Sequence, residues 1–295
     1  MYDLTVLIVT YNSDLEKLKK TIKMSVEQKS ISIQIVIADD GSKNNYFEEI
    51  RRYFSELQFN DFILVENEEN KGTVKNILSG LSVSKGRYIK TISPGDYFDN
   101  ERVMCEWIYQ IEKSNRRWSF CDAIYYSNKD SNKIYTKYHN PIDLKPYIAG
   151  NDKQCMWNYN VLRDYILGAT IICEKKLFDN YLKEIDNKVK YCEDCIYRLM
   201  IFDGNLPYYF SQKAIWYEYG DGISTGGNNK WMEALHKDTI ATDNIILKRK
   251  NNSRYQDRIV EKIKLDQQKN LKNKFKKIFI KGKIVHKIRR WLMWH

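Results

Sequence analysis

The stretch Ile33–Asn45, "IQIVIADDGSKNN", decides the fold of this 295-residue chain. Its apolar residues 35–38 predict a buried strand, and that strand ends in two adjacent carboxylates, Asp39 and Asp40. Asp, Gly and Ser are common residues of turns and helix caps, so an ordinary turn is one interpretation. A ligand site is the other, because open parallel α/β sheets bind ligands beyond the carboxyl ends of their strands.

Strands and helices alternate regularly around this stretch. Apolar runs predict strands at 4–10, 31–38, 62–67 and 87–93. Apolar residues at helical spacing predict helices over 14–28, 46–57 and 73–83, the first capped by Ser13 or Asp14. Such alternation is typical of a parallel sheet with helices on both faces.

The pattern loosens after residue 100. We expect a helix over 100–113 with Asp99 as its cap, mixed strand-like pieces and loops over 121–160, and a helix over 191–203. An aromatic strand is expected at 207–220 and helices from about residue 229 onward.

Charge is unevenly distributed along the chain. From Lys248 to the end there are 17 Lys and Arg residues and 3 acidic ones, whereas the first 247 residues hold 32 basic and 35 acidic residues. A basic tail on a nearly balanced body favours an anionic partner surface, either a membrane or a nucleic acid.

The cysteines and the termini give weaker signals. Six cysteines show no dense disulfide pattern, and Cys192 and Cys195 form a CxxC pair without the second pair of a zinc site. There is no basic leader with an apolar core, and no apolar run of about 18 residues. We therefore expect a cytoplasmic protein with reduced thiols.

Four successive strand ends carry polar or aromatic side chains. They are residues 10–12, "TYN"; Asp39 and Asp40; residues 70–72, "NKG"; and Asp96. Neither the glycine-rich dinucleotide fingerprint nor the P-loop motif is present. A nucleotide-sugar site needs a ring to stack on the base, a carboxylate for its imide N–H, and a carboxylate for a cation on the diphosphate. A turn explains each feature singly, but the set favours such a site.

A second acidic pair, Glu193 and Asp194, opens the predicted helix at 191–203. A carboxylate there could serve as general base for an acceptor hydroxyl. Acidic residues are also common in the first turn of a helix because of its dipole, and the pair alone does not separate the two readings.

The segments "VLIVTYN", "IVIADDGS", "NKG", "SPGDYF" and "EDCIYRLM", in this order, resemble glycosyltransferase family 2, inverting enzymes with the GT-A fold. The resemblance covers residues 4 to about 225. It implies a nucleotide-sugar-binding half over 1–100 and an acceptor-binding half over 101–228, with 229–295 as a basic helical extension. It also implies a role in bacterial surface polysaccharide synthesis, such as capsule or lipopolysaccharide.

The resemblance also implies roles for single residues. Tyr11 would stack on the base, Asp39 would hydrogen-bond it, and Asp40 would support the loop or the ribose. The full set implied to bind the nucleotide is Thr10, Tyr11, Asn12, Asp39, Asp40, Asn70, Lys71, Gly72, Lys75 and Gly95.

For catalysis, the resemblance implies Asp194 as the base with Glu193 beside it, and Asp96 as ligand of a divalent cation, Mn²⁺ or Mg²⁺. Pro94 and Gly95 precede Asp96 where the family's metal motif usually has another acid, so we expect a weaker metal dependence.

The aromatic segment near residue 220 resembles the part of these enzymes that closes over the donor or acceptor. An acceptor site and a core strand are both consistent with it. The residues concerned are Trp216, Tyr217, Tyr219 and Ser224.

The tail at 275–294 predicts a basic amphipathic helix. One helical stripe holds Phe275, Ile278, Phe279, Val285, Ile288 and Leu292, and Trp291 and Trp294 lie near its end. Such a helix is typical of one that lies in a membrane interface, although a helix packed on its own domain with a solvated basic face is the alternative.

Together these features predict an inverting transferase that moves a sugar from a nucleotide sugar, most often a UDP-sugar, to a lipid-linked saccharide. It would lie at the inner face of the cell membrane. A nucleotidyltransferase and a nucleic-acid-binding protein are the alternatives, but the helical register of the tail aromatics argues against a nucleic-acid partner.

Overall fold

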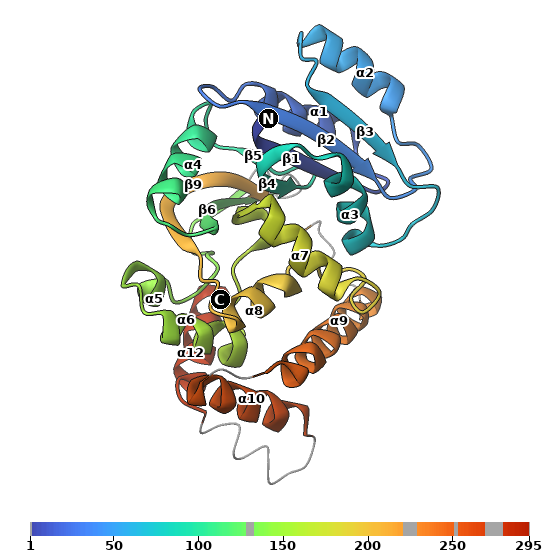
Figure 1. Ribbon diagram of the computed structural model, residues 1–295. Helices are drawn as coiled ribbons and strands as arrows, with labels where there is room; N and C mark the ends of the chain where they lie inside the picture. The colour runs from blue at the N-terminus through green and yellow to red at the C-terminus, as the bar shows by residue number, and fades with distance from the viewer. Residues whose placement is uncertain (1, 128–132, 221–228, 251–252, 269–279, 295) are drawn as a thin grey trace.

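A computed structural model describes residues 2–127, 133–220, 229–250, 253–268 and 280–294. Figure 1 shows an α/β body in the first two thirds of the chain, with the C-terminal helices gathered at one end. No helix in the described part of the chain is both long and apolar enough to cross a membrane.

The first half alternates between strand and helix as predicted. Its elements are β1 (Tyr2–Thr10), α1 (Leu15–Val26), β2 (Ile33–Asp39), α2 (Phe47–Glu56), β3 (Phe62–Glu66), α3 (Thr73–Val83) and β4 (Gly86–Ile92). Asp14 caps α1 by accepting a hydrogen bond from the Lys17 backbone N–H, which confirms one of the two predicted caps.

The second half contains elements that the sequence pattern did not reveal. Its first part holds β5 (Tyr97–Phe98), α4 (Val103–Lys113), β6 (Trp118–Ser127), β7 (Lys133–Tyr135), α5 (Lys145–Ile148) and α6 (Asp152–Trp157). Then follow β8 (Ile171–Glu174), α7 (Lys175–Ile185), α8 (Cys195–Phe202) and β9 (Tyr208–Glu218). Strand β8 and helices α5 to α7 were missed, because they are short or lie in an irregular stretch.

The strands described form one sheet in the order β3-β2-β1-β4-β8-β6-β9-β5, with β7 paired to β6. The first four strands are parallel, and β8 joins β4 in antiparallel orientation. The chain runs from β1 outward to β3 and then returns to the other side of β1 with β4. This reversal is the switch point at which open α/β sheets form a ligand crevice.

Helices cover both faces of the sheet, as predicted. Along β1, Leu4, Val6 and Ile8 belong to one apolar core, while Leu7 belongs to the other. Successive side chains of a strand point to opposite faces, so a continuous apolar run feeds both cores. Helices α1, α2 and α4 pack on the first core, and α3, α7 and α8 on the second.

Three helices are described in the C-terminal region: α9 (Asn229–Lys248), α10 (Arg254–Gln267) and α12 (Lys283–Trp294). Ile246 of α9, Ile259 of α10 and Ile280 are buried in the second core. The predicted extension is therefore packed onto the domain rather than hanging from it.

Asp99 does not cap the fourth helix, contrary to the prediction. Helix α4 begins at Val103 with Arg102 at the cap position. The pairing of β5 with β9 brings Trp216 alongside, and its indole Nε1–H donates to the Asp99 carboxylate at 2.9 Å.

A buried ion-pair network joins α8 to α9. The Asp243 carboxylate accepts hydrogen bonds from Arg198, at 2.6 Å, and from Arg163, at 2.8 Å. The Arg198 residue is 1% exposed. Removing one partner of such a pair leaves an uncompensated buried charge.

We predict that Asp243→Asn lowers the free energy of unfolding by about 3–5 kcal/mol, because two guanidinium groups lose their only carboxylate in this network. The matched control is Glu174→Gln in the more exposed pair with Arg117, which should cost less than about 1 kcal/mol. Denaturant titration measures both, and equal losses would contradict the network's role.

Candidate functional site

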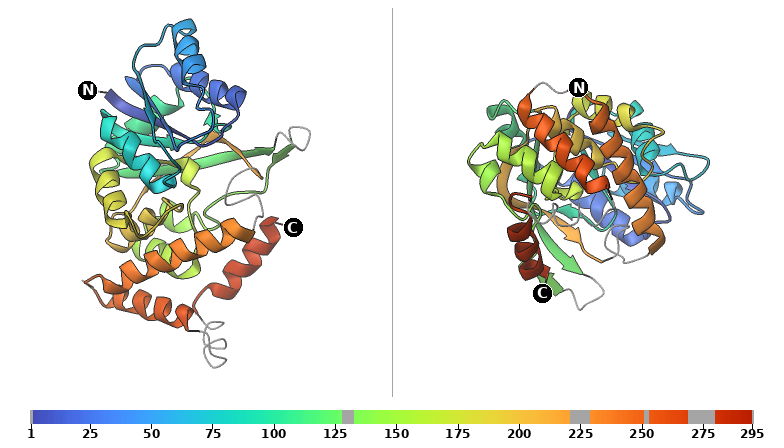
Figure 2. Two further views of the ribbon diagram at one scale, coloured as in Figure 1. Left: turned by 90° about the vertical axis from the view of Figure 1, so that its right-hand side faces the viewer. Right: turned by 90° about the horizontal axis from the view of Figure 1, so that it is seen from below.

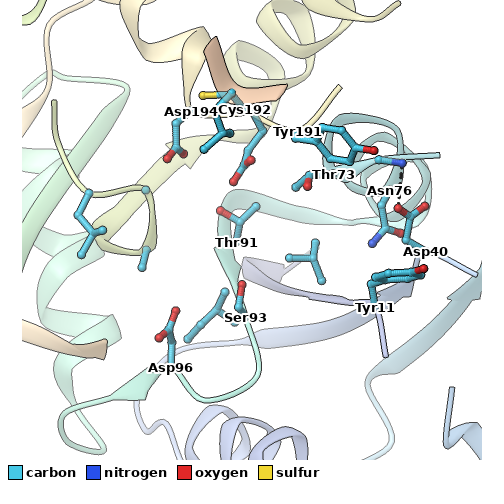
Figure 3. Close-up of a pocket in the computed structure, with 18 of the residues that line it drawn as sticks. Tyr11, Asp40, Thr73, Asn76, Thr91, Ser93, Asp96, Tyr191, Cys192 and Asp194 are labelled. Carbon is cyan, nitrogen blue, oxygen red and sulfur yellow. Dashed lines mark hydrogen bonds between the residues drawn. The ribbon is translucent and has the colours of Figure 1, made fainter. Parts of the chain in front are cut away.

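A cavity of about 740 Å³ lies beyond the carboxyl ends of β1, β2 and β4. Parts of α1, α3 and the turn before β8 line it, as do the loop before α8, the end of β9, and α9. Figure 3 shows Tyr11, Asp40 and Asn76 together at one end of the cavity, with Asp96 and Asp194 well apart from each other toward the other end.

At the first end, Thr10, Tyr11 and Asp40 line the cavity as predicted. The Tyr11 side chain is half exposed and presents a ring to the cavity. Asn76 is held by its amide donating to the Ala38 carbonyl oxygen at 2.9 Å. A ring beside a carboxylate provides stacking and hydrogen-bonding groups for a planar heterocycle.

The two carboxylates after β2 are arranged in the reverse of the predicted way. Asp39 is 1% exposed and accepts hydrogen bonds from the Thr10 hydroxyl, the Ser42 hydroxyl and the Ser42 N–H. It faces the chain's own network and does not line the cavity, whereas Asp40 does. The parallel register explains this, because it pairs Asp39 with Thr10.

Asp40 also orders the next loop. Its two carboxylate oxygens accept the backbone N–H groups of Lys71 and Gly72, each at 2.9 Å. A carboxylate has about four acceptor positions, so both oxygens keep capacity for a ligand. Gly72 has φ +92°, and an added Cβ would lie 2.5 Å from the Lys190 side chain, so this position requires glycine.

Of the other residues predicted to bind the nucleotide, some line the cavity and others lie outside its lining. Asn70 lines the cavity. Asn12 links the first two turns, since its Oδ1 accepts the Lys43 N–H at 3.0 Å. Lys71 and Lys75 are exposed and lie outside the lining, and so does Gly95.

At the second end, Asp96 is buried and accepts the Glu218 backbone N–H at 2.9 Å. The Glu218 carboxylate, from β9, occupies the space beside Gly95, where an added Cβ would lie 2.4 Å from Oε2. Lys17 pairs with Glu218 at 2.7 Å. Burial above all, and also the charge of Glu218, raise the pKa of Asp96 to about 7.

Two neighbouring buried carboxylates fit a divalent cation bound together with diphosphate oxygens. Glu218 supplies from another strand the second acid that the sequence lacks beside Asp96. Mg²⁺ commonly takes one or two protein carboxylates and completes its shell with phosphate and water. No group of three or more His, Cys, Asp or Glu side chains suited to a metal occurs among the described residues, so phosphate oxygens would have to contribute.

Asp194 lines the cavity at the N-terminus of α8, but it does not cap that helix. Within the described chain its carboxylate makes no hydrogen bond or salt bridge. It lies against Gly168, where an added Cβ would be 2.3 Å from Oδ1. Burial raises the pKa of Asp194 to about 6, with the charge of Lys90 opposing the rise. Asp194 still lies at the N-terminal end of α8, so the helix-dipole interpretation from the sequence is compatible with its position.

Lys90 is a fully buried lysine in β4, between the two acids of this end. Its ammonium donates to the Thr91 carbonyl oxygen at 2.7 Å and to the Ala169 carbonyl oxygen at 2.6 Å. It thereby fixes the turn that carries Gly168. Burial lowers the pKa of Lys90 to about 8, and the charges of Asp96 and Asp194 oppose this.

Helix α9 holds the loop that precedes the acidic pair. The Asp238 carboxylate accepts the backbone N–H groups of Lys190, Tyr191 and Cys192 at 2.7–3.1 Å. These bonds fix the loop, and α8 begins at Cys195 rather than at 191. Trp231 of α9 packs edge-on against Tyr191 and lines the cavity.

The described residues among the predicted acceptor set do not all line the cavity. Tyr217 lines the cavity. Trp216 stacks on Tyr97, and Tyr219 packs against Tyr125, Tyr135 and Tyr138 beside the β6–β7 hairpin. Ser224 lies outside the described residues.

Sequence reasoning missed several residues of the site, chiefly Lys17, Asn76, Lys90, Glu218, Trp231 and Asp238. They occupy ordinary positions within helices or strands, and no local motif marks them. The charge of Lys90 inside the apolar strand "RYIKTIS" could have indicated a functional position, because lysine is rarely buried in a parallel strand without a partner.

The family model of glycosyl transferase family 2 matches residues 5–170, more than half of the chain. The chain belongs to this family, and its resemblance to it is confirmed. A segment of 101 residues is also 29% identical to the uncharacterised protein MJ0544 of Methanocaldococcus jannaschii, and covers 33% of this chain and 43% of that relative.

Two solved structures share the fold. S. aureus TarS 1–349 superposes with a TM-score of 0.59 at 14% identity, over 88% of this chain and 70% of that one. Mannosyltransferase PcManGT from Pyrobaculum calidifontis, in complex with GDP-Man and Mn²⁺, gives a TM-score of 0.61 at 12% identity, over 88% and 68%. The GT-A fold is thus confirmed.

We predict that Gly168→Ala lowers the turnover of sugar transfer by about 10²-fold, because the new methyl group displaces the Asp194 carboxylate by an ångström or more. The melting temperature and donor affinity should change little. The control is Gly150→Asn, at a φ of +62° with nothing near its Cβ, which asparagine tolerates. Normal turnover in Gly168→Ala would show that the position of Asp194 is unimportant.

Proposed function

We propose that this glycosyltransferase moves a sugar from a UDP-sugar to a saccharide hydroxyl with inversion at the anomeric carbon. One observation carries the proposal. In a family 2 chain, a single cavity has groups for a base at one end and, at the other, a carboxylate with no hydrogen bond to the described residues.

The base end supports a uracil nucleotide. Asp40 would accept the imide N–H of the base, and Tyr11 would stack on its face. A guanine base also offers N–H donors to a carboxylate. The structures of TarS with UDP and UDP-GlcNAc and of PcManGT with GDP-Man show that proteins of this fold bind either kind of donor.

The second end would hold the diphosphate. Asp96 and Glu218 would bind a divalent cation, Mn²⁺ or Mg²⁺, which neutralises charge that develops on the leaving diphosphate. Lys17 is partly exposed and long enough to turn from Glu218 toward a phosphate oxygen. These residues would fix the diphosphate at the end of the cavity that contains Asp194.

Asp194 would act as the general base. It takes the proton of the acceptor hydroxyl, and the oxygen bonds to the anomeric carbon while the bond from that carbon to the diphosphate oxygen breaks. Attack from the face opposite the leaving group inverts the anomeric configuration. Lys90 keeps the turn beside Asp194 in place. Glu193 lies next to Asp194 on the same cavity wall.

The acceptor would enter past Tyr217, since sugar rings stack on aromatic faces. A lipid-linked saccharide of bacterial surface polysaccharide synthesis, such as capsule or lipopolysaccharide, is the acceptor class that we propose. The transferred group would be a hexosyl or N-acetylhexosaminyl unit. Such an acceptor would place the enzyme in the cytoplasm, as a peripheral protein on the inner face of the cell membrane.

Product analysis tests this function after a thermal-shift screen of nucleoside diphosphates and their sugars has chosen the donor. A glycosyltransferase releases the nucleoside diphosphate, whereas a nucleotidyltransferase releases or consumes pyrophosphate. Stabilisation by UDP and release of UDP from a UDP-sugar would support the proposal. Release of pyrophosphate would overturn it.

We predict that Asp194→Asn lowers turnover by about 10² to 10⁴-fold while donor affinity is kept, because the base is lost but not the shape of the site. In the wild type the carboxylate is ionised above its pKa of about 6 and protonated below it. The rate should therefore fall about tenfold per pH unit below 6. This inflexion should vanish in Asp194→Asn and persist in the control Asp179→Asn, which lies on α7 outside the cavity.

We predict that Mn²⁺ increases the thermal stabilisation given by UDP, and that Asp96→Asn and Glu218→Gln each reduce this increase. Their carboxylates are the protein's contribution to the cation site, so stabilisation by UDP alone should change less. Melting curves with and without EDTA measure the effect. Full UDP-dependent stabilisation and full activity in EDTA would show that Lys17 replaces the cation.

A further inference from the structure

Helix α12 carries an exposed apolar surface. Ile284, Val285, Ile288, Trp291 and Leu292 are 52–59% exposed. A single 12-residue helix thus holds nearly half of the large apolar side chains that are exposed in the described part of the chain. Contiguous exposed apolar residues of this kind mark an interaction surface.

The opposite face of α12 attaches it to the domain. His286 and Met293 are buried there. Arg290 donates to the Arg163 carbonyl oxygen at 3.2 Å, and Lys283 pairs with Asp266 at 3.0 Å. The preceding turn is held by the Trp157 indole, which donates to the Lys281 carbonyl oxygen at 3.0 Å.

An ordinary surface helix turns its apolar side to the core and its charges to solvent. Here a largely polar face is docked and the apolar face is outside. The sequence left two alternatives for this helix, and the structure has it packed on its own domain. The packing nevertheless leaves Val285, Ile288 and Leu292 of the predicted stripe exposed. Phe275, Ile278 and Phe279 of that stripe and the Trp294 side chain lie outside the described residues.

Charge surrounds this apolar surface on both edges. At about 100° per residue, the five apolar side chains span about 120° of the helix. Lys287 lies on one edge, and Arg289 lies on the other, where it pairs with Asp143 at 3.4 Å. No acidic residue follows Asp266 in the chain. An apolar stripe bordered by cations complements a lipid surface with anionic headgroups.

We infer that α12 binds an anionic membrane surface, with its axis along the interface and the stripe from Ile284 to Leu292 inserted among the acyl chains. Lys287 and Arg289 would then lie at headgroup level. A nucleic acid would instead require cations at the centre of the outward face, where Ile288 lies. This inference goes beyond sugar transfer and does not depend on it.

The arrangement of the molecule suits such a surface. Both views of Figure 2 show the β6–β7 hairpin and the end of α12 projecting on the same side. Ile134 on the hairpin is also half exposed. The β6 and β9 strands that lead to this side also carry the aromatic residues beside the cavity.

Co-sedimentation of the full chain with vesicles tests the inference without any substrate. The wild type should bind vesicles of phosphatidylcholine mixed with phosphatidylglycerol more tightly than pure phosphatidylcholine. The double variant Ile288→Ser/Trp291→Ser should lose binding at least about tenfold, because two inserted side chains are removed. The matched control Tyr109→Ser/Ile148→Ser removes equally exposed apolar groups elsewhere and should bind normally.

A charge variant separates the two contributions. Lys287→Gln should weaken binding to the anionic vesicles about fivefold and leave binding to neutral vesicles unchanged. Circular dichroism should show both α12 variants folded, and turnover on a soluble acceptor should be retained. If the wild type ignores vesicles, or the double variant binds as well as the control, the inference is wrong. If the wild type sediments as a dimer and the double variant as a monomer, a second copy of the chain covers the stripe instead of a membrane.

Discussion

The pairing of β1 with β2 on one side and β4 on the other is the constraint on which the site depends. It brings the ends of three parallel strands to one edge of the sheet and fixes their register, so that Thr10 lies opposite Asp39. The loops after β2 and β4 leave this edge on either side of β1, and a crevice opens between them. Both ends of the cavity are consequences of this one arrangement.

Buried carboxylates in this protein have two different uses. Asp40, Asp164 and Asp238 each accept two or more backbone N–H groups and thereby fix a loop. These bonds compensate the cost of burying a charge. Asp194 is only partly buried in the cavity wall, and the described residues give it no hydrogen bond. A carboxylate left without donors has a raised pKa and is available to a substrate proton.

The helices of the basic C-terminal region differ in their positions, although the charge of the region is uniform along the sequence. Helix α9 is part of the glycosyltransferase body, because Trp231 lines the cavity and Asp238 holds the loop before Glu193. Residues on both sides of the boundary expected at residue 228 therefore line the cavity. Helix α12 lies at the surface and turns apolar side chains outward, an orientation that only a partner surface makes favourable.

The sequence by itself determined the parallel N-terminal half, the family and the strand ends that meet at the site, because periodicity and strand-end residues are local signals. It did not determine which of Asp39 and Asp40 faces the cavity, since that follows from the register with β1. Glu218 beside Asp96, Lys90 under Asp194 and Asp238 before α8 were decided only by the tertiary structure. Each of these contacts joins residues far apart in the chain, and the distance between them is set by how strands and helices pack, which no short segment records.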